Sequence, residues 1–300
     1  MWRYLNGKSC LMFFPNKMYN GIMKSPIKYF GGKGGMYKTI LDQFPCGFGE
    51  DKTKTSNNGA ETYIEPFGGS GAILFHKKTS PVEIYNDIED NVYSFFKVLS
   101  DPKLFKEFKD LCSLTFFSHK IFTEFSEDLK NPSLTLLERA FKFYYVNRVA
   151  YNGVGSFSCS VNAIRRGMSK TVSDMLSSID RLPEVHNRLR SVIIENRNAL
   201  DIIKKYDNDN VLFYLDPPYH HSTRGGARYD KDMNDDQQLL FIEILLGIQK
   251  AKVLLSGYSC DLYDKLTDNG WFRYDFIVKT QSGKRESKDK VESLWRNYDI

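Results

Sequence analysis

Five short apolar runs, rich in β-branched residues, restrict the fold of this 300-residue sequence more than any other feature. They lie at residues 62–65, 82–85, 192–194, 211–215 and 252–256, and most are followed by a segment with helical character. Alternating strand and helix signals are typical of βα units, in which helices cover both faces of a parallel sheet. The predicted fold class is therefore α/β, with a doubly wound sheet.

The stretch between the second and third runs lacks strand signals. Residues 101–190 show helical patterns at 104–111, 134–146 and 172–182, and a polar, basic, glycine-containing loop at 152–170. Just before this stretch, apolar residues at helical spacing predict a helix packed on the sheet: Ile88, Val92, Phe95, Phe96 and Leu99. We interpret residues 101–190 as a helical insertion in an α/β domain of residues 24–100 and 191–300. Residues 1–23 are then an N-terminal extension, and 47–60 an exposed loop.

The composition argues against several classes of protein. No apolar run approaches the roughly 18 residues of a membrane helix, and the N-terminus lacks the apolar core of a secretory signal. We therefore expect a cytoplasmic protein without membrane contact. Five widely spaced cysteines, with no CxxC pair, predict reduced thiols and no metal site. A net charge of +5 is compatible with a polyanionic partner but does not identify one.

The sharpest motif is Asp216-Pro217-Pro218-Tyr219, directly after the run at 211–215. In open α/β sheets, ligands bind outside the carboxyl ends of the strands. The two prolines fix φ and remove two backbone donors. Asp216 and the Pro217 carbonyl could each accept one N–H of a planar amine while the Tyr219 ring stacks on its base, which favours a nitrogen lone pair directed at an incoming methyl group. A proline-stiffened surface turn is the alternative.

Three further segments are candidates for ligand binding. The glycine-rich turn at 63–71 follows a strand, so it could bring the backbone close to a ligand or could be a tight connection only. Asp87 ends the second strand, where ribose hydroxyls are commonly held, but it could also cap the next helix. The basic, aromatic and glycine-containing segment at 28–33 could close over a ligand carboxylate or could be a solvated turn.

Taken in order, these motifs resemble the Dam-like class (D12 class, alpha group) of adenine-N6 DNA methyltransferases. The shared segments are KYFGGK at 28–33, YIEPFGGSG at 63–71, YND at 85–87, DPPY at 216–219 and VESLWRNY at 291–298. The resemblance implies a Rossmann-like methyltransferase sheet. It also implies that a site-specific enzyme transfers a methyl group from S-adenosylmethionine to N6 of an adenine flipped out of double-stranded DNA.

Carried over position by position, the resemblance implies roles for individual residues. Asp216, Pro217, Pro218 and Tyr219 would form the catalytic loop. The residues implied in donor binding are Tyr29, Lys33, Glu65, Phe67, Gly68, Gly71, Asp87, Asn198 and Asp216. Of these, Tyr29 and Lys33 would contact the methionine end and Asp87 the ribose. Asn198 stands where the family commonly has an Asp that recognises the donor's adenine, and its amide oxygen can still accept a hydrogen bond.

The helical insertion would read the DNA, and its segment at 147–153 resembles a recognition motif of the family. The candidate DNA-binding residues are Arg148, Asn152, Arg165, Arg166 and Arg224, the last in the segment after the catalytic loop. Arginines in such places read guanine edges or touch phosphates. Gln237 and Gln238 stand near a helix start where many members of the family have a His, and no chemical consequence is assigned to them.

Several alternatives stay open. The acceptor could be N4 of cytosine or another amino group, although Asp as the first residue of the DPPY motif favours adenine. The chain could also be a catalytically silent DNA-binding relative, which the presence of both donor and acceptor motifs disfavours. A NAD-dependent dehydrogenase is disfavoured because GxGxxG is absent. The recognition sequence, the oligomeric state and a cognate restriction endonuclease partner are not determined by the sequence.

Overall fold

A computed structural model describes residues 23–29, 31–46, 48, 61–219, 233–279 and 289–300. Several expectations fall outside these residues: most of the proposed N-terminal extension, nearly all of the loop at 47–60, and Arg224.

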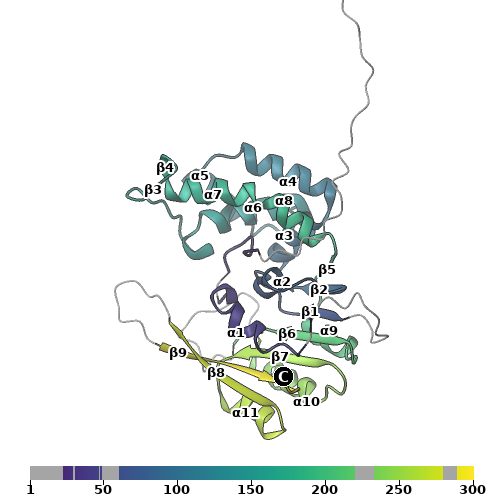
Figure 1. Cartoon of the computed structure of the whole chain (residues 1–300). Coiled ribbons are helices and arrows are strands. Elements are labelled where there is room, and N and C mark those ends of the chain that lie inside the picture. Colours follow the sequence, from purple (N-terminus) through teal and green to yellow (C-terminus); the bar gives the residue numbers. More distant parts are fainter. Residues whose placement is uncertain (1–22, 30, 47, 49–60, 220–232, 280–288) are drawn as a thin grey trace, which may run out of the picture.

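The molecule is built on a seven-stranded sheet (Figure 1). Five strands run parallel in the order β5 (Val192–Glu195), β2 (Val82–Asn86), β1 (Thr62–Glu65), β6 (Val211–Leu215) and β7 (Lys252–Gly257). The strand β9 (Asp289–Arg296) pairs antiparallel with β7, and β8 (Phe272–Lys279) pairs antiparallel with β9 at the edge. The predicted α/β class is confirmed, and each of the five predicted runs coincides with a strand.

Helices cover both faces of the sheet because side chains alternate along each buried strand. One face carries Tyr63, Tyr85 and Leu212, which pack with α1 (Tyr37–Leu41), α2 (Ala72–His76) and α3 (Asp90–Ser100). The other face carries Ile64 and Phe213, which pack with α9 (Ala199–Lys205), α10 (Asp235–Leu246) and α11 (Asp261–Asp268). The short helix η1 (Lys33–Gly35) precedes α1.

A helical layer lies on the α3 side of the sheet (Figure 1). It comprises α4 (Pro102–Leu114), α5 (His119–Asp128), α6 (Leu136–Val149), η2 (Tyr151–Gly153), α7 (Lys170–Asp180) and α8 (Leu182–Leu189). The ring of Phe95 in α3 stacks on that of Tyr144 in α6, with centroids 5.4 Å apart. The helix α3 therefore connects the sheet to the helical layer.

Two expectations about this region are wrong in detail. The stretch is not free of strands, because β3 (Ile164–Arg165) and β4 (Met168–Ser169) form a small hairpin. Its two-residue turn places Arg166 at φ 55° and Gly167 at φ 73°, and strands this short leave no alternation to detect. The second concerns Ile88, which precedes the helix rather than packing within it: α3 begins at Asp90, and Ile88 is 46% exposed.

In the described part of the chain, no helix is long and apolar enough to cross a membrane. The same residues contain no group of three His, Cys, Asp or Glu side chains arranged to hold a metal ion.

Candidate active site

The carboxyl ends of β1 and β6 lie side by side because these two parallel strands are neighbours. The chain leaves β1 toward β2 on one side, whereas β6 lies on the other side, so this is the switch point of the sheet. Ligands bind at such points in open α/β folds. The glycine-rich turn follows β1 and the DPPY loop follows β6, so the fold brings two of the predicted motifs together.

The glycine-rich turn can be made only with small residues. Gly69 and Gly71 have φ values of 49° and 65°, the left-handed region that favours glycine. A Cβ on Gly68 would lie 2.2 Å from the ring of Tyr85 in β2. The Tyr85 hydroxyl in turn donates to the carbonyl oxygen of Gly69. The turn is therefore packed directly on β2.

Asp87 ties this turn to the end of β2. Its carboxylate is buried and accepts the backbone N–H of Gly69 at 2.7 Å and that of Glu89 at 2.8 Å. The cap of α3 is Glu89, whose side chain accepts the N–H groups of Asn91 and Val92. Capping of α3 therefore does not explain Asp87, and its role in ribose binding stays a prediction.

Glu65 lies at the end of β1, inside the protein. Its carboxylate accepts the Tyr63 hydroxyl at 2.5 Å and a backbone N–H from Leu74 in α2. Burial raises the pKa of Glu65 to about 7, although both hydrogen bonds oppose this rise. Phe67, also assigned to the donor pocket, packs edge-on against Phe241 of α10, with ring centroids 5.8 Å apart. The contacts recorded for both residues are with the core.

The carboxylate of Asp216 is held in one orientation. Its Oδ1 accepts Lys33 Nζ at 2.7 Å and the Ser256 hydroxyl at 3.0 Å. Among the described residues, none donates a hydrogen bond to Oδ2, and the side chain is 22% exposed. Lys33 also donates to the Gly31 carbonyl at 3.1 Å. One carboxylate oxygen is thus fixed by the protein, and the other is available to a ligand.

Of the two proline carbonyls in the DPPY loop, one is bound by the protein and the other is available to a ligand, as with the two oxygens of Asp216. The Pro218 carbonyl accepts Gln238 Nε2 at 2.8 Å, and the Tyr263 hydroxyl donates to Gln238 Oε1 at 3.2 Å. No hydrogen bond to the Pro217 carbonyl is found within the described ranges. Gln238 is completely buried in α10. It was not recognised in the sequence as a site residue, yet it anchors the DPPY loop; the only signal for it was its place near a helix start.

The aromatic residue of the loop, Tyr219, is surrounded by charged and aromatic groups. Its hydroxyl donates to Glu292 Oε1, and its ring meets that of Tyr258 edge-on with centroids 4.8 Å apart. Lys33 Nζ lies 4.7 Å from the ring centroid and 3.6 Å from Glu292 Oε1. Burial, followed by the charges of Asp216 and Glu292, raises the pKa of Tyr219 well above its usual value, so the phenol stays protonated and donates.

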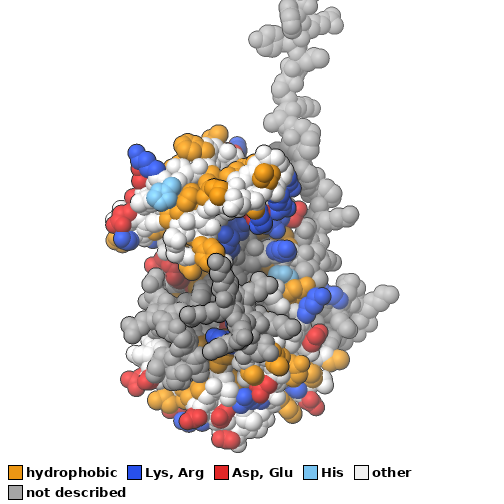
Figure 2. Space-filling view, turned by 90° about the vertical axis from the view of Figure 1, so that its left-hand side faces the viewer, with side chains coloured by type: hydrophobic (Ala, Val, Ile, Leu, Met, Phe, Trp, Pro, Cys, Tyr) orange, Lys and Arg blue, Asp and Glu red, His pale blue; other side chains and the backbone are white. Residues whose placement is uncertain are grey.

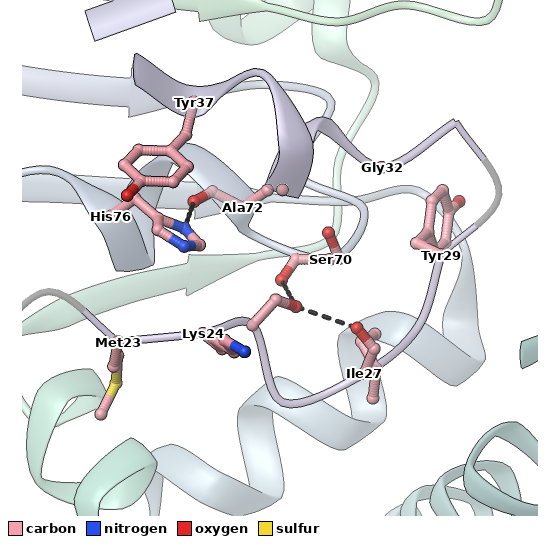
Figure 3. A pocket seen from close by; sticks show the side chains of 11 residues that line it. Met23, Lys24, Ile27, Tyr29, Gly32, Tyr37, Ser70, Ala72 and His76 are labelled. Atoms are coloured by element: carbon pink, nitrogen blue, oxygen red, sulfur yellow. Dashed lines mark hydrogen bonds between the residues drawn. The ribbon is translucent and has the colours of Figure 1, made fainter. Parts of the chain in front are cut away.

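A cavity of about 470 Å³ opens beside the glycine-rich turn (Figure 3). Tyr29, Gly32 and Ser70 line one end, and the stacked rings of Tyr37 and His76, with centroids 4.0 Å apart, lie at the other. Neither Asp87 nor Asp216 lines it. Of the predicted donor residues, the cavity therefore includes Tyr29 alone.

Asn198 caps the helix α9. Its side-chain oxygen accepts the backbone N–H of Leu200 at 2.9 Å. This N-cap contact accounts for an Asn at the position, and recognition of the donor's adenine by Asn198 stays a prediction.

The sequence matches a known protein family over most of its length. The family model described as D12 class N6 adenine-specific DNA methyltransferase matches residues 29–282. The chain belongs to this family. It is an adenine-specific DNA methyltransferase.

Similar proteins carry consistent names at low identity. The methyltransferase is 27% identical to the type II methyltransferase M.MjaIII of Methanocaldococcus jannaschii, over 92% of this chain and 99% of that protein. It is 22% identical to the DNA adenine methylase of Haemophilus influenzae, over 89% of this chain and 91% of that protein. It is also 22% identical to the modification methylase StsI of Streptococcus sanguinis, over 92% of this chain but 43% of that protein.

In this methyltransferase, the first motif is joined to the helical layer by Asn147 of α6. The Asn147 side chain accepts the backbone N–H of Lys28 at 2.9 Å and donates to its carbonyl at 2.6 Å. Lys28 Nζ donates to the carbonyls of Arg148 and Ala150 at 3.2 Å each. Gly153 has φ 83°, and a Cβ there would lie 2.6 Å from that of Lys28. The segment at 147–153 is thus bound to the segment that carries Lys33.

The candidate DNA-binding residues of the methyltransferase lie in different environments. Arg148 is only partly exposed; its Nη2 donates to the Asp174 carbonyl at 3.5 Å, and burial followed by the Arg181 charge lowers its pKa. Arg165 is paired with Asp174 at 2.6 Å, whereas Arg166 is exposed in the hairpin turn. Asn152 is exposed, at φ 53°. Lys and Arg side chains also gather beneath the helical layer, where the surface is hollowed (Figure 2).

Proposed function

We propose that this methyltransferase transfers a methyl group from S-adenosylmethionine to N6 of an adenine flipped out of duplex DNA. The observation that carries the proposal is the Asp216 carboxylate, with Oδ1 held by Lys33 and Ser256 and Oδ2 accepting nothing from the described residues. The Pro217 carbonyl lies next to it in the chain. Together they offer the two acceptors that an exocyclic NH₂ group needs.

The residues at the end of β1 and β2 fit a nucleoside donor. Asp87 presents a buried carboxylate at a strand end, where it can accept hydrogen bonds from ribose hydroxyls. The glycine-rich turn packs closely on its neighbours, because a Cβ on Gly68 would lie 2.2 Å from the Tyr85 ring and one on Gly71 3.0 Å from the Phe75 ring. Tyr29 lies against Gly69, because a Cβ on that glycine would be 3.1 Å from the Tyr29 ring. When bound, the donor supplies an electrophilic methyl group on a sulfonium sulfur.

The acceptor loop prepares the target nitrogen. The lone pair of the N6 amine is delocalised into the adenine ring, which makes it a poor nucleophile. When Asp216 Oδ2 and the Pro217 carbonyl accept its two N–H groups, the nitrogen becomes more tetrahedral and its lone pair can be directed at the methyl carbon. Tyr219 provides the face on which the base stacks. Lys33 Nζ lies 2.7 Å from Asp216 Oδ1 and offsets the charge of the carboxylate in this partly enclosed site.

The duplex is proposed to contact the helical layer. A base must leave the stack to reach Asp216, and the unstacking cost of a few kcal/mol has to be offset by contacts to the rest of the DNA. The exposed hairpin with Arg166 and the basic groups around Arg148 are suited to such contacts. The names of two relatives, a type II methyltransferase and a modification methylase, support a further proposal, that the methylated sequence is also the target of a restriction endonuclease.

The test is methylation of unmethylated plasmid DNA by purified protein with S-adenosylmethionine, followed by mass spectrometry of the nucleosides. We expect N6-methyladenine from the wild type and a rate at least about 10²-fold lower from Asp216→Ala, because one preorganised polar contact is lost. The matched control is Asp275→Asn on β8, a carboxylate whose partners are Arg273 and Ser293, and its rate should be unchanged. N4-methylcytosine as the product would overturn the adenine assignment, and full activity of folded Asp216→Ala would overturn the mechanism.

A further inference from the structure

Glu292 is a buried carboxylate on the strand β9. It is 3% exposed, and its neighbours along the strand include the buried apolar residues Leu294 and Trp295. Glutamate is rarely buried to this degree unless it is paired, because removing a carboxylate from water is costly. The contacts of Glu292 must therefore offset that cost.

Both recorded partners of the Glu292 side chain belong to the candidate active site. The Tyr219 hydroxyl donates to its Oε1, and Lys33 Nζ lies 3.6 Å from the same oxygen. In the described part of the chain, no other hydrogen bond or ion pair of this side chain is found. Were Glu292 there for the stability of the sheet alone, an apolar residue would fill its place without the desolvation cost.

The contacts restrain the Tyr219 ring from several directions. The hydroxyl is held by Glu292, the ring meets Tyr258 edge-on at 4.8 Å, and Lys33 Nζ lies 4.7 Å from the ring centroid. A ring held at its hydroxyl end as well as at its Cβ cannot swing away from its position. A platform for a flipped base has to be fixed in this way before the base arrives.

We propose that Glu292 is a positioning residue of the acceptor loop, holding the Tyr219 ring by its hydroxyl at the angle at which the target base stacks. This inference rests on the proposed function, since it assigns Tyr219 to base capture. Lys33 lies between Glu292 and Asp216, so Glu292 also helps to keep the ammonium beside Asp216. Capture of the target base, rather than binding of the donor, is the step that Glu292 serves.

The test compares four variants in steady-state methylation of plasmid DNA. Glu292→Gln keeps the size and an acceptor for the Tyr219 hydroxyl, whereas Glu292→Leu keeps only the size. We expect Glu292→Leu and Tyr219→Phe each to lower kcat/KM for DNA about 10-fold, the usual effect of losing one such hydrogen bond. Glu292→Gln should stay within about 3-fold of wild type. The double variant should fall about 10-fold to 20-fold, not 100-fold, because the two changes remove the same contact.

Donor binding separates positioning from a general loss of structure. Calorimetry with S-adenosylmethionine should give affinity and stoichiometry within about 2-fold of wild type for all four variants, and rates are expressed per donor-binding molecule. Val291→Ala, a change at the exposed neighbour on the same strand, is the matched control and should leave kcat/KM unchanged. A 100-fold loss in the double variant, or a Glu292→Gln protein as impaired as Glu292→Leu, would overturn the proposal.

The same assay judges the proposed function separately. Its test is the identity of the methylated nucleoside made by the wild type, whereas the inference about Glu292 depends only on ratios between variants. If the wild type made N4-methylcytosine, the adenine assignment would fail, and non-additivity of Glu292→Leu and Tyr219→Phe would still support Glu292 as the positioning residue.

Discussion

The ammonium nitrogen of Lys33 lies 2.7 Å from Oδ1 of Asp216, although 183 residues separate the two in the sequence. Lys33 is 4% exposed and comes from the first motif, whereas Asp216 begins the DPPY loop. The Ser256 hydroxyl at the end of β7 is the second group on the same oxygen. Three segments of the chain thus converge on one carboxylate oxygen, which fixes where the other points.

The pair predicts a large effect of Lys33→Met, which keeps the length of the side chain and removes its charge. Among the described residues, Asp216 would keep the Ser256 hydroxyl as its partner, and it would lose the cation that offsets its charge. We expect the methyl-transfer rate in single-turnover experiments to fall about 10²-fold. Lys38→Met, at an exposed lysine in α1, is the control and should be neutral. An unchanged rate in folded Lys33→Met would show that the ion pair is dispensable.

The assignment of Asp87 to the ribose predicts weaker donor binding when its carboxylate is removed. Asp87→Ala should weaken binding of S-adenosylmethionine by about 1 to 3 kcal/mol, the usual cost of losing a charge-assisted hydrogen bond. Asp87→Asn keeps one acceptor oxygen and should lose less. Because Asp87 also accepts the N–H groups of Gly69 and Glu89, thermal unfolding must be followed alongside calorimetry. Unchanged donor affinity in a folded Asp87→Ala protein would contradict the assignment to ribose.

The hydrogen bond from Gln238 to the DPPY loop leads us to expect that support from α10 affects the rate of methyl transfer. Gln238→Leu leaves the Pro218 carbonyl and the Tyr263 hydroxyl without the partner they share. We expect the rate per donor-binding molecule to fall about 10-fold. Its neighbour Gln237 is the control: it completes the capping box of α10, so Gln237→Ala should cost about 1 kcal/mol of stability and leave the rate unchanged. Equal rates for the two variants would mean that the loop holds its shape without Gln238.

The parallel part of the fold was predictable because its strands are buried on both faces and read as continuous β-branched runs. The strand β6, at Val211–Leu215, coincides with its predicted run. Because ligands bind outside the carboxyl ends of the strands, the sequence predicted that Asp216 lies at the ligand-binding edge of the sheet. Its place beside the glycine-rich turn follows from the pairing of β6 with β1, which the sequence analysis did not predict. The helix α5 was missed, although Ser118 caps it and Ile121, Phe122 and Phe125 give it an apolar face.

Contacts made by long-range packing were not predictable. Glu292 reaches Tyr219 because β9 inserts antiparallel between β7 and β8, and no local pattern specifies that insertion. The DNA contact of Arg148, inferred from its motif, stays a prediction; the structure adds that its Nε is buried and has no hydrogen-bond partner among the described residues. Which face of α6 packs inward depends on its neighbours α3 and α7, so the environment of Arg148 could not be read from the sequence.

Glu65 predicts a pH-dependent stability. Burial raises its pKa to about 7 from the usual 4.5, so the folded chain keeps a proton that the unfolded chain has lost. The free energy of unfolding therefore falls as pH rises from about 4.5 to about 7, by roughly 3 kcal/mol in all, and stays low above that. Glu65→Gln does not titrate, so its stability relative to wild type should increase by roughly 2 to 3 kcal/mol from pH 5 to pH 8 in urea unfolding. Glu243→Gln, at an exposed site in α10, is the control, and a pH-independent difference for Glu65→Gln would contradict the prediction.

Arg166 predicts how the hairpin contacts DNA. It is exposed in the two-residue turn between β3 and β4, at φ 55°, and its Nη1 donates to the Ser177 hydroxyl of α7 at 3.1 Å. If Arg166 touches a phosphate, Arg166→Ala should weaken binding to all duplexes alike and reduce the slope of log affinity against log salt by about 1. If it reads a guanine edge, the binding free energy should weaken by about 1 to 3 kcal/mol on duplexes that contain the sequence the enzyme recognises, and by less on other duplexes. Lys265→Ala, at an exposed lysine in α11 on the far side of the sheet from the helical layer, is the control (Figure 1). Unchanged affinity and salt slope for Arg166→Ala, with Lys265→Ala also neutral, would exclude the hairpin turn from the DNA interface.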